Sequence, residues 1–268
     1  MVTHDDALTA PGSLYRRREM GYGTGRAPAT ATAGILTCAL LAAACTTRAP
    51  APAPLPPEPI PGIPAEQGIA AGIPIPAGAR GFDIDPGKSV VTILVNRAGP
   101  FAKFAHNHVV TSGQEIGYAW VADDLAGSGF EIRVPVVSLV VDDPAARAAV
   151  GGEFAGEVPQ SARQGTYANM TRPEVLDAAE FPEVTVRCPG LAGSWERPVA
   201  AVDLAIRGAT RRIEVPIALE RAADTLVARG SFQIRQTDFG ITPFSVAGGA
   251  IQVGDELEIR FEIAAVAR

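Results

Sequence analysis

The chain has 268 residues, of which 47% are hydrophobic and 6% aromatic, and its formal net charge is -6. Acidic residues outnumber basic ones 29 to 23, so nucleic-acid binding is excluded as a main role, because a surface that follows phosphates needs clustered positive charge. Of the 3 cysteines, only Cys188 falls in the expected folded part, which excludes an intradomain disulfide and favours a buried thiol.

Residues 1–45 are expected to form an export signal. Arginines at positions 16–18 and 26 precede an uncharged run rich in Ala, Leu and Ile that ends at Cys45. Small residues before this cysteine resemble a bacterial lipobox, in which Cys45 would be a lipid anchor. Cleavage after Ala44 with soluble secretion and a retained transmembrane anchor are the alternatives. Export predicts a location in the periplasm or cell envelope.

Residues 46–81 are expected to form a disordered linker. Their repeated Pro, Gly and Ala residues do not build ladders or helices, so an extended polyproline-type spacer is expected. The predicted organisation is therefore a signal segment at 1–45, a Pro-rich linker at 46–81 and one domain at 82–268.

The domain shows the period-2 pattern of half-buried antiparallel strands. Apolar residues alternate with charged ones in segments that begin near Val91, Phe130, Val202, Ile213, Phe232 and Leu257. Seven or eight such segments joined by short turns favour an all-β barrel or a sandwich. The shared apolar face is suited to lining a cavity for an apolar guest and equally to a dry core, so the pattern leaves both open.

The alternation stops between about Asp142 and Phe181. Pro144–Val150 and Pro159–Met170 are predicted to be helical, with proline in the first turn, and Pro173–Ala178 is predicted to add one more turn. Because a single helical excursion in a strand domain usually caps a barrel mouth or covers an opening in the sheet, we expect that arrangement here.

Both histidines of the domain lie in the short segment Ala105–His108, which reads Ala-His-Asn-His. On an extended strand His106 and His108 would point the same way, because side chains two residues apart share a face. Four roles are open: metal ligands, acid/base groups, struts that close a hairpin, and polar groups at a cavity mouth.

Metal and catalytic roles have little further support in the sequence. A zinc or copper site needs a third ligand, and the candidates, which are Asp123, Asp124, Asp238 and Cys188, show no ligand spacing. No Gly-x-Ser-x-Gly elbow or paired-carboxylate motif provides a nucleophile for a histidine to activate. We therefore expect a protein that is not an enzyme and has no metal or catalytic residue.

Four motifs in order resemble the YceI-like family of exported bacterial proteins associated with polyisoprenoid binding. They are Phe82–Ser89 (FDIDPGKS), Leu176–Thr185 (LDAAEFPEVT), Leu204–Thr210 (LAIRGAT) and Phe232–Ile241 (FQIRQTDFGI). The resemblance covers essentially Phe82 to Ala267. The His-Asn-His run departs from the common family pattern in the first hairpin and indicates a subgroup.

The resemblance implies an extended antiparallel lipocalin-like β-barrel of about eight strands with a helical excursion, whose apolar tunnel takes a long isoprenoid chain. We accordingly predict an envelope-tethered, non-catalytic protein, monomeric or dimeric, that binds an amphiphilic isoprenoid lipid of the quinone or polyprenyl type and no other cofactor. The alternatives are a metal-binding or enzymatic barrel that uses His106 and His108, and a structural envelope protein with a filled core.

The predicted site has three parts. Cys45 is the predicted lipid anchor, and the polar candidates at the cavity mouth are His106, His108 and Asp238. The predicted lining of the lipid cavity is Val91, Ile93, Val95, Ile132, Val134, Leu204, Ile206, Val215, Phe232 and Ile234.

Overall fold

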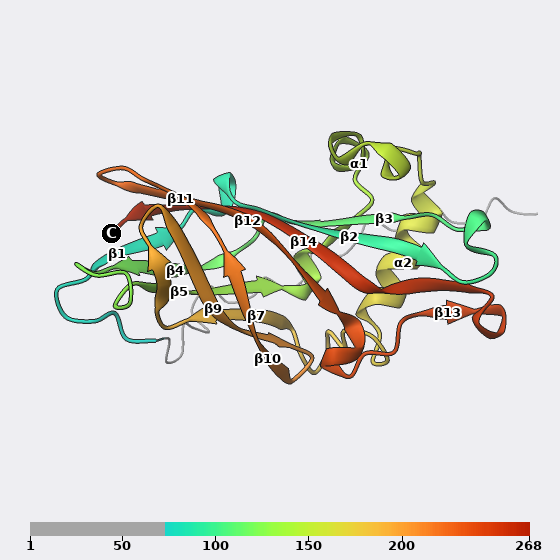
Figure 1. Ribbon diagram of the computed structural model, residues 1–268. Helices are drawn as coiled ribbons and strands as arrows, with labels where there is room; N and C mark the ends of the chain where they lie inside the picture. Colours follow the sequence, from blue (N-terminus) through green and yellow to red (C-terminus); the bar gives the residue numbers. More distant parts are fainter. Residues whose placement is uncertain (1–72) are drawn as a thin grey trace, which may run out of the picture. The chain divides into compact units, whose positions relative to one another are not determined.

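The computed structural model describes residues 73–268, which form one antiparallel sheet with two α-helices (Figure 1). The expected signal segment, the Cys45 anchor and most of the expected linker lie outside the described residues. The first strands are β1 (Arg80–Ile84), β2 (Val90–Ala98), β3 (His108–Ser112), β4 (Ile116–Val121), β5 (Gly129–Pro135), β6 (Val140–Val141) and β7 (Glu183–Cys188). The remaining strands are β8 (Leu191–Ser194), β9 (Arg197–Ile206), β10 (Ala209–Pro216), β11 (Ala218–Arg221), β12 (Thr225–Arg235), β13 (Ser245–Val246) and β14 (Ile251–Ala267).

All 14 strands belong to one sheet, which is not closed. Neighbours follow the order β10-β9-β7-β5-β4-β1-β14-β2-β3-β6, with β8 on β9, β12 and β13 on β14, and β11 on β12. The expected barrel of about eight strands is therefore corrected to an open sheet of 14 strands. Several additional strands are only two to four residues long, too short for alternation to reveal them.

A proline divides the segment that the alternation predicts as a single strand from Ile213 to Glu220. β10 ends at Pro216, which has no N–H to donate to a ladder, and β11 begins at Ala218. β10 pairs with β9, whereas β11 pairs with β12. The chain thus passes from one part of the sheet to another without a continuous ladder.

The long strand β14 organises the sheet. One edge pairs with β12, and the other pairs with β2 and then with β1. Ile259 lies between Phe232 of β12 and Ile93 of β2, so apolar side chains from three strands form a row on one face. The strict alternation in these strands produces this row.

The two α-helices lie where the sequence predicts them. α1 (Pro144–Val150) is capped by Asp143, whose carboxylate accepts hydrogen bonds from the amides of Ala145 and Ala146 at 2.9 and 3.0 Å. α2 (Gln160–Thr171) begins directly after Pro159. The further helical turn predicted at Pro173–Ala178 is wrong: this segment forms non-helical turns, and Asp177 has a positive φ of 49°.

The folded unit includes residues ahead of Phe82. β1 begins at Arg80, and the backbone of Ile73 donates to Glu131 at 3.2 Å and accepts from the Tyr118 hydroxyl at 2.8 Å. These contacts hold residues 73–81 against β4 and β5. Between residues 73 and 268, no helix is long and apolar enough to cross a membrane.

Candidate functional site

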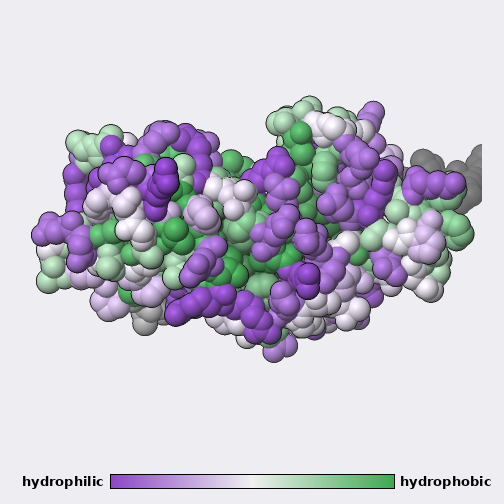
Figure 2. All heavy atoms as spheres, in the orientation of Figure 1, coloured by the Kyte–Doolittle hydropathy of each residue, from purple (hydrophilic) through white to green (hydrophobic). Residues whose placement is uncertain are grey.

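A largely apolar cavity of about 420 Å³ is lined by side chains from the strands of the sheet and from α2. This volume is within the usual range for small-molecule sites, roughly 300–1,000 Å³. Its wall combines branched aliphatic residues with aromatic ones from many strands, and α2 adds Thr166, Asn169 and Met170. The helical excursion therefore covers part of the cavity, as expected. Figure 2 shows hydrophobic residues gathered in a hollow near the middle of one face.

The ten residues predicted as lining all border this cavity: Val91, Ile93, Val95, Ile132, Val134, Leu204, Ile206, Val215, Phe232 and Ile234. The pleat explains the agreement, because residues at i and i+2 of a strand share a face. The sequence analysis missed the contributions of β4, β8 and α2, where short strands or helical spacing hide the pattern. Their role in lipid binding stays a prediction.

His108 reaches the cavity through the register of β2 and β3. Ile93 pairs with Val110, and Val95 pairs with His108, so the histidine extends an apolar row on the inner face. His106, which lies just before β3 and is exposed, also borders the cavity. Both predicted mouth histidines therefore border the cavity.

Several polar lining residues gather around this hairpin, while Ser128, Thr166, Asn169 and Gln236 add polar groups elsewhere on the wall. Asn96, Arg97, His106 and His108 come from β2, β3 and their connection, and Gln252 comes from the adjacent start of β14. The strands that form the rest of the wall contribute mainly aliphatic and aromatic side chains. The cavity is consequently amphiphilic, with a polar end and an apolar body.

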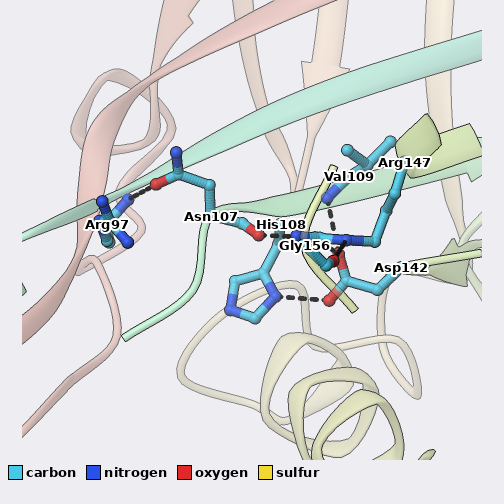
Figure 3. A network of polar contacts seen from close by, with 7 residues as sticks. All are labelled: Arg97, Asn107, His108, Val109, Asp142, Arg147 and Gly156. Carbon is cyan, nitrogen blue, oxygen red and sulfur yellow. Dashed lines mark hydrogen bonds and ion pairs between the residues drawn. The ribbon is translucent and has the colours of Figure 1, made fainter. Parts of the chain in front are cut away.

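His108 is hydrogen-bonded to Asp142, which forms a buried ion pair with Arg147 (Figure 3). Nδ1 of His108 lies 2.6 Å from Oδ2 of Asp142, whose side chain is 0% exposed. Oδ1 of Asp142 accepts from the Val109 amide at 2.9 Å and from Nη1 of Arg147 at 2.5 Å. Both carboxylate oxygens are thus occupied, and the histidine ring is fixed in orientation.

The charge state of Asp142 determines the tautomer of His108. Burial raises the pKa of Asp142, but the hydrogen bonds from His108 and Val109, the His108 charge and the Arg147 hydrogen bond outweigh it, so the pKa is lowered. An ionised carboxylate only accepts hydrogen bonds, so Nδ1 of His108 must carry the proton. In the neutral ring, Nε2 is then a hydrogen-bond acceptor.

Asn107, between the two histidines, closes the hairpin. Its Oδ1 accepts from the Arg97 amide at 3.0 Å, and its carbonyl accepts from Nη1 of Arg147 at 2.7 Å. Asn107 is 2% exposed, and Figure 3 shows its side chain directed to Arg97 and away from the His108 ring. Asn107 therefore closes the hairpin, and His108 combines a structural hydrogen bond to Asp142 with a place in the cavity wall.

Asp238 lies outside the cavity lining. It is exposed on the 3₁₀ turn Gln236–Phe239, and this turn directs Gln236 and Phe239 to the cavity instead. The period-2 pattern that relates Asp238 to Ile234 ends where the turn begins, so the strand-based placement fails there.

Cys188 is confirmed as a buried thiol: it is 0% exposed, and burial raises its pKa to about 11. Within residues 73–268, no group of three or more His, Cys, Asp and Glu side chains is arranged to hold a metal ion. In that part of the chain, His106 and His108 therefore gain no third ligand.

Sequence reasoning also missed Asp142 and Arg147. Asp142 lies 34 positions from His108, and the two meet only because β6 pairs with β3. The one local signal is the sequence Asp142-Asp143-Pro144, in which Asp143 is enough to cap the helix and Asp142 is left without an expected role.

A family model and one solved structure agree with this fold, and two further structures are more distantly similar. A sequence model of the YceI-like domain matches residues 82–265. The crystal structure of Burkholderia cenocepacia BcnA is similar, with a TM-score of 0.51 and 15% identity over 69% of this chain and 100% of that one. A polyisoprenoid binding domain from Saccharophagus degradans implicated in plant cell wall breakdown has a TM-score of 0.45 and 12% identity, covering 70% and 98%. The YceI protein of Campylobacter jejuni reaches 0.41 and 10%, covering 59% and 84%. None of the curated proteins matches the chain.

Proposed function

The chain belongs to the YceI-like domain family, and from this premise we propose that it is a binding protein for an amphiphilic isoprenoid lipid, of the polyprenyl or quinone type, in a subgroup marked by His106 and His108. The observation that carries the proposal is the position of the His108–Asp142 pair at one end of a largely apolar cavity.

The apolar body of the cavity provides the affinity. Each CH₂ group transferred from water to such a wall contributes about 0.8 kcal/mol, so a chain of a few isoprene units is held firmly by its length. A wall of branched aliphatics and phenylalanines offers no hydrogen bonds that would select one chain over another. Chain binding alone is therefore unselective for the headgroup.

The polar end provides selection. When the His108 ring is neutral, with Nδ1 bonded to Asp142, its Nε2 accepts a hydrogen bond, so the headgroup that fits presents a hydroxyl, as a prenol or a hydroquinone does. Asn96 and Gln252, also at this end, add amide groups that both donate and accept. A ligand with a long chain and a hydroxyl head fits both halves of the site.

We propose that this binding is not coupled to catalysis. The Cys188 thiol stays protonated at neutral pH, because burial raises its pKa to about 11, and it lies outside the cavity lining. Among the described residues, the His108 ring is hydrogen-bonded to the Asp142 carboxylate and not to a hydroxyl that it could activate as a nucleophile.

A metal-dependent role is the second candidate, and one observation favours it. Histidines that bind a metal usually donate their other ring N–H to a carboxylate or carbonyl, as His108 does to Asp142. Elemental analysis of the purified protein decides between the two: near-stoichiometric metal that is lost in the His106→Ala, His108→Ala double variant would establish the metal site and overturn lipid binding as the primary function.

We place the protein in the bacterial envelope, held through Cys45 as a lipid anchor. The supporting feature is the run of small residues before Cys45 at the end of an apolar segment. Fractionation of cells that express Cys45→Ser tests this: export with loss of membrane association is expected. Unchanged membrane association would remove Cys45 as the anchor.

The function itself is tested by organic extraction and mass spectrometry of the purified exported protein. A prenyl-chain lipid close to equimolar with the protein is expected, and His108→Phe should retain less of any lipid that bears a hydroxyl. Preparations that contain no lipid, and that take up none from added polyprenol, would contradict the proposal.

A further inference from the structure

The connection between β2 and β3 exposes two aromatic rings. Phe101 is 53% exposed and Phe104 is 70% exposed, and their ring centres lie 6.3 Å apart. Phe104 ends the 3₁₀ turn Ala102–Phe104, and Phe101 directly precedes it. Among residues 73–268 they are the two exposed aromatic side chains. A pair of neighbouring exposed phenylalanines is costly in water and therefore indicates a surface with a partner.

Backbone contacts hold this turn in place. The Phe101 amide donates to the Ala250 carbonyl at 2.8 Å, and Nη1 of Arg97 donates to the Ala105 carbonyl at 3.1 Å. Gly99 has a φ of +92°, and a Cβ there would lie 2.8 Å from the Ala250 oxygen, so the approach to β14 requires glycine. We call residues 99–105 the aromatic tip. Its rings are presented by a fixed structure.

The turn between β13 and β14 lies beside the aromatic tip and extends its apolar surface. Val246, the last residue of β13 before this turn, is 43% exposed, and Figure 1 shows β13 and the β2–β3 connection at the same end of the sheet. The pairing of Gln252 with Ala98 confirms that the two segments are neighbours. The apolar surface is therefore formed by two connections, not by one loop.

The charge around the aromatic tip differs from that of the rest of the chain. Residues 97–108 and 239–254 contain no Asp or Glu, although the chain has 29 acidic residues and a net charge of -6. Lys103, on the tip, places its ammonium 5.0 Å from the centre of the Phe104 ring. Arg97 is nearby and lies 3.7 Å from Glu153. Exposed aromatics beside a cation, on two connections that themselves carry no carboxylate, suit the interface of an anionic membrane.

The aromatic tip is continuous with the polar end of the cavity. Ala105, His106 and Val246 border both the exposed surface and the cavity. A flat membrane in contact with Phe101 and Phe104 would therefore lie next to the polar end of the cavity.

We propose that the aromatic tip docks the protein on the surface of an anionic phospholipid bilayer. Phe101 and Phe104 insert at the headgroup boundary, and Lys103 contacts lipid phosphates. Docking does not require that the cavity bind lipid. Its consequence, lipid exchange between bilayer and cavity, rests on the function proposed above.

Vesicle flotation tests the docking. The exported full chain carrying Cys45→Ser, so that acylation cannot anchor it, is mixed with vesicles of phosphatidylcholine alone or with equal phosphatidylglycerol. Binding to the anionic vesicles is expected, with a loss of more than about tenfold in the Phe101→Ser, Phe104→Ser double variant, because two exposed rings lose their burial. Lys103→Ala should lose about fivefold on anionic vesicles and nothing on neutral ones.

The matched control is Val90→Ser with Ile116→Ser, which removes two exposed apolar side chains remote in sequence from the tip, Val90 being at the opposite end of β2. It should bind vesicles like the parent. Thermal unfolding and the lipid content of the phenylalanine variant should match the parent, so failure of docking is separable from failure of lipid binding. Absence of vesicle binding by the parent, equal loss in the control, or a parent dimer that the phenylalanine substitutions dissociate without any vesicle binding would each overturn the proposal.

Discussion

The two ends of the cavity are built by different means. The apolar body is formed by side chains that alternate along long strands, such as β9, β12 and β14, and many neighbours share the packing. The polar end depends on one buried network, in which Asp142 joins His108, Val109 and Arg147. A distributed wall tolerates single changes, whereas a network centred on one carboxylate does not. The same molecule should therefore respond very differently to substitutions at its two ends.

The largest effect is expected at Asp142. Asp142→Asn leaves the buried guanidinium of Arg147 without its counter-charge, and breaking one partner of a buried pair costs roughly 3–5 kcal/mol in the free energy of unfolding. Urea denaturation measures it. The adjacent Asp143→Asn is the control, because asparagine also caps a helix, and it should change stability by a few tenths of a kcal/mol at most, roughly. Equal effects at both positions would remove the distinction between the two ends.

In the apolar body, a larger side chain should displace ligand instead of unfolding the protein. Ala228 of β12 borders the cavity, and Ala228→Phe would occupy space for about two CH₂ groups of a bound chain, which corresponds to roughly 1.6 kcal/mol, or about 15-fold in affinity. Lipid titration and thermal unfolding of delipidated protein measure the two quantities. The exposed Ala192→Phe on β8 is the control.

The result also distinguishes a cavity from a filled core. If the lining were a dry core, Ala228→Phe would cost about 1–3 kcal/mol of stability through overpacking. That loss without any change in lipid binding would favour the structural envelope protein considered from the sequence.

At the polar end, His108→Phe keeps an aromatic ring and removes the acceptor. A net hydrogen bond contributes about 1 kcal/mol, so affinity for a prenol should fall about fivefold. Affinity for a polyisoprene hydrocarbon without a headgroup should stay unchanged or rise. Competition assays with the two ligands measure the ratio, and His106→Phe serves as a comparison. An equal loss for both ligands would assign His108 to packing only.

The smallest effect is expected on how the free energy of unfolding falls at acidic pH. Because the pKa of Asp142 is lowered in the folded protein, its contribution is present above the ordinary aspartate range, near 3.9, and is lost as the pH falls through the lowered value. The wild-type protein should therefore lose stability on acidification below about pH 4 more steeply than Asp142→Asn. Parallel curves of unfolding free energy against pH would contradict the assigned ionised state.

The sequence predicted the apolar body well and the polar end only in part. Alternation is local, so Val91, Ile93 and Val95 could be assigned to one face without knowing their partners. The link from His108 to Asp142 depends on the pairing of β3 with the two-residue strand β6, which has no periodic signal. The His-Asn-His run indicated the place of the polar end, but the partners that define its chemistry are distant in sequence.

The same contrast explains the error in the strand count. Alternation of apolar and polar residues predicts long strands such as β14. It does not predict the short strands β6, β8, β11 and β13. The break between β10 and β11 at Pro216 could not be predicted either. A proline at a strand end is compatible with either a continued or an interrupted ladder.

The most direct test of the central claim uses the two tryptophans of the chain. Trp120 and Trp195 both border the cavity, so a chain inside it lies within contact distance of the indoles. Titration of delipidated protein with a bromine-labelled polyprenol should quench tryptophan fluorescence to saturation at one ligand per protein, and Ala228→Phe should shift the curve to higher concentrations. Unchanged fluorescence at saturating ligand, with both tryptophans present, would contradict lipid binding in this cavity.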